Sequence, residues 1–86
     1  MFSVEFSNQA KKFLKNLDNH IVERIPKIIY RLKENPVPSD AKFIGRENEE
    51  MVFRYRIGDH RALYKFKEKE KVILITKIDK RSIVYK

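Results

Sequence analysis

The spacing of apolar residues changes near residue 51, and this change sets the fold class. From residue 10 to residue 32 the apolar side chains recur every three to four residues, which is the period of an amphipathic helix. Beyond residue 51 they alternate with polar side chains, which is the period of a half-buried strand. Helices followed by a run of strands predict an α+β domain rather than alternating βαβ units.

Two helices are predicted in the first half of the chain, behind a short strand. Residues 2–6 alternate in polarity, and Ser7 is suited to cap the helix that follows. The helices are marked by apolar stripes at positions 10, 13, 14 and 17 and at positions 21, 25, 28, 29 and 32. Pro26 interrupts the second stripe, so this helix either starts late or bends near residue 22. The prolines in residues 35–38 end it.

Three strands are predicted in the second half. Residues 53–57 and 61–66 flank Gly58-Asp59, and glycine in the first position favours a type II′ hairpin turn. The nearly all-apolar run 72–78 predicts a buried strand. Residues 39–50 are interpreted as a polar connection.

The order is therefore β-α-α-β-β-β, with two N-terminal helices packed on one face of a mainly antiparallel sheet. At this length we expect one domain spanning residues 1–86.

The predicted hairpin gathers three arginines on one sheet face. A Gly58-Asp59 turn pairs Arg56 with Arg61 and points Arg54 the same way, away from the helices. A three-residue turn after the next strand places Lys77 opposite Arg61, whereas a two-residue turn reverses the parity. Like charges across a strand pair are destabilising. Either the stems cover the sheet while the charges lie in water, or the cluster is a preformed phosphate site.

The net charge limits the partners. The chain carries 20 Lys and Arg against 12 Asp and Glu, a formal charge of +8, which indicates a polyanionic partner or a solvated basic surface. Without cysteine there is neither a disulfide framework nor a zinc–thiolate site. No apolar run approaches the ~20 residues of a membrane span, and the N-terminus lacks a signal-peptide pattern, so we expect a cytoplasmic protein.

Metal-free RNA cleavage needs a group to accept the 2′-OH proton, a proton donor for the leaving oxygen, and cations for the transition state. His60 follows the turn but tips toward the helix-covered face, so a core or turn role is favoured over an auxiliary catalytic one. Tyr85 lies four residues after Arg81, and a neighbouring cation lowers the pKa of a phenol. Packing of Tyr85 against the sheet is the alternative. The carboxylates lie in mixed surface runs, so metal chemistry is not expected. No cofactor is expected either.

The residues of the hairpin resemble those of a known family. FRYRIGDHRALY at 53–64 is similar to the hairpin of RelE/ParE-superfamily toxins, and KRSIVY at 80–85 to the ending of the RelE branch. VEFS at 4–7 with the first helical stripe, and Asn35-Pro36 after the second helix, also fit this pattern. The resemblance covers essentially the whole chain and implies a RelE-like fold.

The resemblance implies the toxin of a type II toxin–antitoxin system. RelE-type toxins are ribosome-dependent, metal-free endoribonucleases that cut mRNA in the A site by 2′-OH attack. Such cleavage leaves a 2′,3′-cyclic phosphate or 3′-phosphate and a 5′-OH. The implied partners are a RelB-like antitoxin, the ribosome and mRNA, with operator DNA bound only through the antitoxin complex.

The family's residue roles transfer to matching positions. Arg61 would contact the scissile phosphate, Arg81 would support the transition state, and Tyr85 would orient or deprotonate the 2′-OH. Arg54 and Arg56 match basic positions that are lysines in some members. Because arginine stays protonated, these two can supply only charge. The general acid is left open among Lys77, His60, water and an rRNA group.

Two other functions remain open. A ParE-like inhibitor of DNA gyrase shares the fold, but ParE-branch toxins generally lack the C-terminal arginine and tyrosine, so Arg81 and Tyr85 favour the nuclease. A basic RNA- or ribosome-binding module without catalysis is the second alternative.

Overall fold

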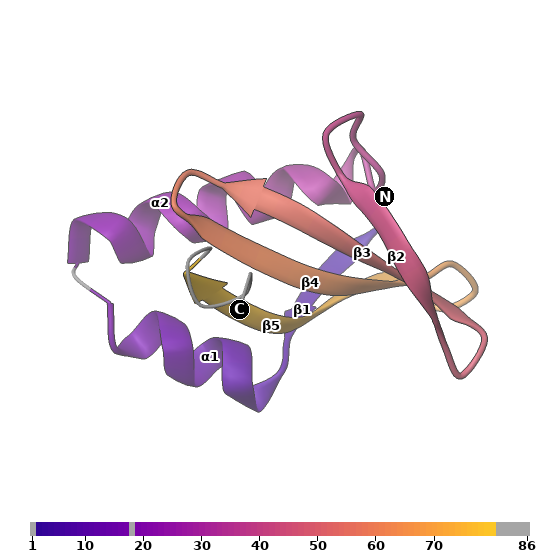
Figure 1. Ribbon diagram of the computed structural model, residues 1–86, viewed down its shortest axis with the longest axis horizontal. Coiled ribbons are helices and arrows are strands. Elements are labelled where there is room, and N and C mark those ends of the chain that lie inside the picture. The colour runs from indigo at the N-terminus through magenta and orange to yellow at the C-terminus, as the bar shows by residue number, and fades with distance from the viewer. Residues whose placement is uncertain (1, 18, 81–86) are drawn as a thin grey trace.

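The computed structural model describes residues 2–17 and 19–80, with the backbone alone for 19–23. The elements, in chain order, are β1 (Ser3–Phe6), α1 (Asn8–Lys15), α2 (Asn19–Tyr30), the 3-10 turn η1 (Arg31–Lys33), β2 (Lys42–Glu47), β3 (Glu50–Ile57), β4 (His60–Lys67) and β5 (Val72–Lys80). One five-stranded sheet has the order β1-β5-β4-β3-β2 (Figure 1). β1 runs parallel to β5 and the other neighbours are antiparallel. The predicted α+β class with leading helices is confirmed.

The sheet has one strand more than the sequence predicted. Residues 39–50 were interpreted as a polar connection, which was wrong because β2 occupies Lys42–Glu47. β2 is an exposed edge strand, and its pairing with β3 shifts between Phe43 and Gly45. That bulge breaks the alternation by which a strand is detected in a sequence.

Ser7 fixes the start of α1 and ties it to the sheet. Its hydroxyl accepts a hydrogen bond from the Ala10 amide at 3.1 Å, as an N-cap does, and donates one to the Thr76 carbonyl at 2.8 Å. The predicted cap is confirmed. α2 begins at Asn19 and continues through Pro26, so the alternative of a late start is wrong. The chain leaves α2 through η1 before the predicted stop at Asn35.

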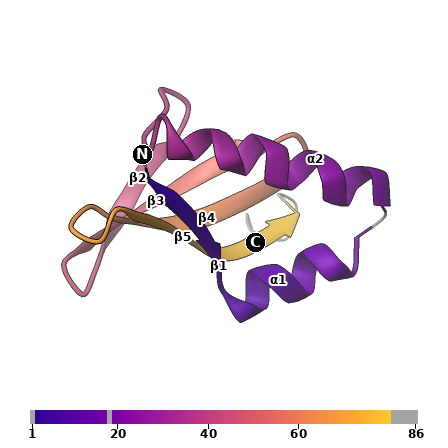
Figure 2. The ribbon, with the colours of Figure 1, turned by 180° about the vertical axis from the view of Figure 1, so that it is seen from behind.

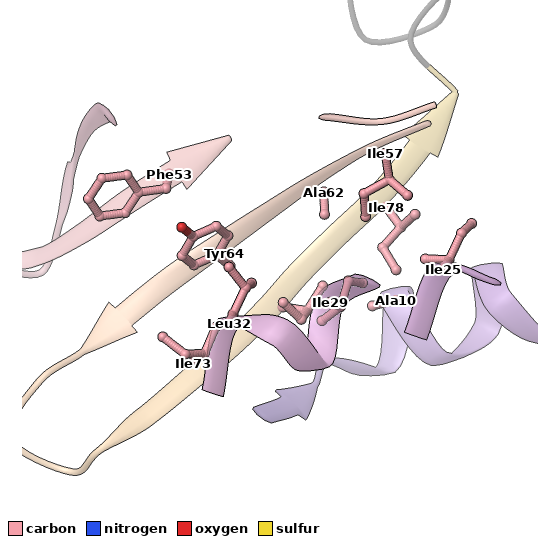
Figure 3. Close-up of a cluster of buried hydrophobic side chains, with 11 residues drawn as sticks. Ala10, Ile25, Ile29, Leu32, Phe53, Ile57, Ala62, Tyr64, Ile73 and Ile78 are labelled. Carbon is pink, nitrogen blue, oxygen red and sulfur yellow. The ribbon is translucent and has the colours of Figure 1, made fainter. Parts of the chain in front are cut away.

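The core lies between the sheet and the two helices, which cover one side of it (Figure 2). Side chains from α1, α2 and η1 meet side chains from β3, β4 and β5 (Figure 3). The buried cluster consists of Ala10, Ile25, Ile29, Leu32, Phe53, Ile57, Ala62, Tyr64, Ile73, Ile75 and Ile78. Burial of each large apolar side chain contributes about 1.5–3 kcal/mol.

Tyr64 adds a polar anchor to this core. It is fully buried, its ring stacks on Phe53 at 5.5 Å, and its hydroxyl donates to the Pro36 carbonyl at 2.7 Å. Tyr55 packs at the edge of the same cluster. Both tyrosines therefore have structural roles. Within the described parts of the chain, no helix has the length and apolarity to cross a bilayer.

Candidate nucleic-acid interface

A basic hollow of about 360 Å³ lies on the sheet face that the helices leave uncovered. Its lining residues are Asp40, Lys42, Arg54, Arg56, Gly58 and Arg61. Along β3 the arginines alternate with the core residues Phe53 and Ile57, so they point to the opposite face. The three arginines predicted to share a face therefore line one hollow, which we call the arginine hollow.

The β3–β4 turn sets this arrangement. Gly58 has a φ of +58° whereas Asp59 does not adopt a positive φ, which is the pattern of the predicted type II′ turn. The two-residue turn pairs Ile57 with His60 and Arg56 with Arg61. The predicted hairpin register is therefore confirmed.

The register of β5 differs from the prediction. Arg61 lies opposite Asp79, and Lys77 lies opposite Leu63, so the prediction that Lys77 faces Arg61 was wrong. The β4–β5 turn is four residues long, and Thr76 is an extra residue where the pairing shifts. Each feature shifts the register by one residue, so the parity is preserved and Lys77 stays on the same face as the arginines.

Asp79 moderates the positive charge beside the hollow. It lies directly across from Arg61, and its carboxylate is 3.3 Å from the Lys77 ammonium. Arg61 is only 3% exposed, whereas Arg56 is exposed and Arg54 half-buried. Low solvent exposure strengthens the electrostatic interactions of Arg61. Arg61 is therefore the fixed cation of the cluster, and Arg56 the accessible one.

His60 lies on the helix-covered face, as the sequence predicted. It is 7% exposed, and its ring meets that of Phe13 edge-on at 5.8 Å. Burial, and then the nearby Lys80 ammonium, lower the pKa of His60 below 6.5, while Asp59 opposes this shift. His60 does not line the arginine hollow.

Arg81 and Tyr85 lie outside the described residues, so their predicted roles stay predictions. In residues 2–17 and 24–80, no three His, Asp or Glu side chains cluster in a way that could hold a metal ion.

Two lining residues were missed by the sequence prediction. Asp40 and Lys42 belong to the segment that was interpreted as a connection. A short alternation could have indicated a strand at Lys42, because the apolar residues Ala41 and Phe43 flank it. Asp40 has no such signal, because its place in the hollow depends on how the loop reaches the sheet.

The chain is thus a small α+β domain with leading helices and a basic hollow on its open sheet face. Residues 4–85 match the protein family described as "ParE toxin of type II toxin-antitoxin system, parDE". The chain is 34% identical to "Putative toxin RelE1" of Methanocaldococcus jannaschii, over 99% of this chain and 96% of the relative. The chain thus belongs to the RelE/ParE family of toxins of type II toxin–antitoxin systems and is of the RelE type.

Solved structures agree with this assignment. RelE in the archaeal RelE–RelB complex from Pyrococcus horikoshii OT3 matches with a TM-score of 0.82 and 29% identity, over 93% of this chain and 94% of that one. The isolated RelE toxin of E. coli matches with a TM-score of 0.77 and 20% identity, over 99% and 92% of the two chains. The second likeness shows the fold alone.

Proposed function

We propose that the chain is a ribosome-dependent, metal-free endoribonuclease that cuts mRNA in the A site. The 2′-OH attacks the adjacent phosphorus, and the 5′ oxygen leaves with a proton. The products are a 2′,3′-cyclic phosphate or 3′-phosphate and a 5′-OH. Because the proposed activity depends on ribosomes, we expect the protein to act in the cytoplasm.

The observation that carries the proposal is the convergence of Arg54, Arg56 and Arg61 on one hollow. Guanidinium groups match phosphate oxygens with paired hydrogen bonds, and cations held in place stabilise the charge of a pentavalent transition state. Arg61 contacts the scissile phosphate in this proposal, while Arg54 and Arg56 bind flanking phosphates. Lys77, on the same face and paired with Asp79, extends the phosphate-binding surface.

The C-terminal residues complete the proposed site by their resemblance to the RelE branch. Arg81 supports the transition state, and Tyr85 orients or deprotonates the 2′-OH. A phenol beside cations is suited to deprotonation, because neighbouring positive charge favours the phenolate.

The proposed partner that controls the activity is a RelB-like antitoxin. RelE of Pyrococcus horikoshii, which this chain resembles at 29% identity, was crystallised as a RelE–RelB complex. An antitoxin that covers the arginine hollow would block phosphate binding directly. Operator DNA is bound through the antitoxin complex in this proposal.

Primer extension on a translated mRNA tests the nuclease. Wild-type protein should produce cuts within codons only when ribosomes are present, and Arg61→Gln should abolish them. Tyr85→Phe should slow cleavage by at least tenfold, since proton-transfer groups contribute about 10²–10⁴. A non-catalytic binding module predicts inhibited translation with intact mRNA, and that result would overturn the proposal.

Inhibition of DNA gyrase is the second candidate, because the matching family is described by the name ParE. A supercoiling assay with purified gyrase distinguishes the two functions. Inhibited supercoiling together with uncut mRNA supports the gyrase inhibitor. Unaffected supercoiling together with codon-specific cuts supports the nuclease.

A further inference from the structure

The proposed reaction needs a proton acceptor and a proton donor, and the arginines can be neither, because arginine remains protonated. Two other candidate proton-transfer groups lie outside the arginine hollow. His60 lies on the helix-covered face, and Lys77 is paired with Asp79 outside the arginine hollow. Among the described residues that line the hollow, Asp40 and Lys42 are the groups that can exchange a proton.

The start of β2 brings these two residues to the hollow. β2 pairs with β3 from Lys42, opposite Arg54, and onward away from the hairpin turn. Lys42 therefore shares the face of its pairing partner Arg54. Just before it, the Ala41 amide donates to the Pro38 carbonyl at 2.9 Å, which closes a turn around Asp40. Asp40 thus lies where β2 stops covering β3, beside the part of β3 that carries Arg56.

The electrostatic environment of Tyr55 agrees with this position of Asp40. Burial raises the pKa of the Tyr55 phenol, and the Asp40 carboxylate raises it further, while Arg31 opposes both. Tyr55 lies between Arg54 and Arg56 in β3. A carboxylate that influences Tyr55 and also lines the hollow lies at the exposed edge of β3.

Asp40 and Lys42 are also available for chemistry. Lys65 and Lys67 pair with Glu47 or Glu50 at the far end of the sheet, and Lys77 pairs with Asp79. Within the described chain neither Asp40 nor Lys42 forms an ion pair, and both are exposed. A carboxylate that were merely the counterion of the arginines would be expected to pair with one of them.

We propose that Asp40 accepts the proton of the 2′-OH and that Lys42 donates the proton to the departing 5′ oxygen. As the O2′–H bond breaks, O2′ forms its bond to phosphorus and the proton moves to the Asp40 carboxylate. The P–O5′ bond then breaks, and O5′ takes a proton from the Lys42 ammonium. Return of one proton from Asp40 to Lys42 through water restores both groups. This inference rests on the proposed nuclease function and assigns Tyr85 to orienting the 2′-OH.

Single-turnover cleavage of mRNA on stalled ribosomes, with toxin in excess, tests the assignment. Asp40→Asn should slow cleavage by about 10²-fold or more, as expected for the loss of a general base. Glu70→Gln, which removes an exposed carboxylate from the β4–β5 turn, is the matched control and should cleave at the wild-type rate.

A counterion role makes the opposite prediction. If Asp40 only balanced charge, Asp40→Asn would bind the ribosome–mRNA complex more tightly and cleave as fast as wild type. That result would overturn the inference while leaving the nuclease intact, provided Arg61→Gln is inactive. Absence of cleavage by the wild type would instead contradict the proposed function itself.

A sulfur substitution separates the donor from the acceptor. A thiolate leaving group needs no proton, so mRNA with sulfur in place of the 5′ oxygen at the cut should restore cleavage by Lys42→Met. The same substrate should not rescue Asp40→Asn. Equal rescue of both variants, or of neither, would contradict the assigned roles. Because both side chains are exposed, the variants should unfold at the wild-type urea concentration.

Discussion

Arg56 and Arg61 lie directly opposite one another across the β3–β4 hairpin, and both line the same hollow. Cross-strand like charges cost some tenths of a kcal/mol, and nothing in the turn requires arginine at either position. Asp79 lies opposite Arg61 on its other side, and its carboxylate is 3.3 Å from the Lys77 ammonium. The pairing of two arginines is therefore better explained by anion binding than by a contribution to the stability of the sheet.

Removal of the exposed member of this pair should separate function from stability. Arg56→Gln should weaken binding to the ribosome–mRNA complex and reduce the slope of log affinity against log salt by about 0.7–1, since one phosphate contact is lost. The free energy of unfolding should stay within about 0.5 kcal/mol of wild type, because Arg56 is exposed. Salt titrations of binding and urea unfolding measure the two quantities.

The matched control is Arg46→Gln. Arg46 is an exposed arginine of β2 outside the arginine hollow, and its side chain donates to the Glu49 carbonyl at 3.3 Å. If binding depends on the total charge alone, both variants should lose the same affinity, and a specific role for the hollow would then be refuted.

Ser7 offers a test of how the helices are attached to the sheet. Ser7→Ala removes the cap of α1 and the hydrogen bond to the Thr76 carbonyl in one change. We expect a loss of about 1–2 kcal/mol, at the upper end of cap effects, because a long-range bond is lost as well. Urea unfolding should show a lower midpoint with an unchanged slope. Ser7→Thr keeps the hydroxyl and should unfold near the wild-type midpoint.

The β3–β4 hairpin could be predicted from its own residues, whereas the register of β5 could not. The pairing of Arg56 with Arg61 follows from the two-residue turn, and Gly58 allows this turn to be predicted from the sequence. The β4–β5 turn places Lys71 at a φ of +60°, a conformation that lysine does not signal. Thr76 likewise has the sequence of an ordinary strand residue although it forms the bulge.

The candidate site was predictable to the same extent. The arginines of the hollow follow from strand alternation within one hairpin. Asp40 and Lys42 reach it only because an exposed edge strand pairs with β3, and such a strand buries too little apolar surface to show a period. The positions of Asp40 and Lys42 depend on the pairing of strands in the whole sheet. The local sequence pattern carries no information on that pairing.

Tyr64 tests the polar anchor of the core. Tyr64→Phe deletes the hydroxyl that donates to the Pro36 carbonyl and leaves the ring in place. We expect a loss of about 1–2 kcal/mol, because a carbonyl that is partly buried loses its partner. Thermal unfolding measures this loss, with Tyr55→Phe as the matched control at the core edge, expected to cost less. A Tyr64→Phe protein as stable as wild type would show that water replaces the bond without cost.

His60 should make the stability of the fold depend on pH. Burial and Lys80 hold the pKa of His60 below 6.5, so the unfolded chain binds this proton more readily than the folded one. Stability from this group is therefore complete above the unfolded pKa and is lost as the pH falls below it. Asp59 opposes the shift, and the Phe13 ring packed on the imidazole cannot accept a hydrogen bond from the imidazolium in the way that a carboxylate can.

Urea unfolding at about pH 7.5 and about pH 5.5, where most carboxylates remain ionised, measures this effect. The free energy of unfolding should fall more for wild type than for His60→Gln between the two pH values. Equal losses would show that the imidazole charges without penalty, and would place His60 in a wetter site than its 7% exposure indicates.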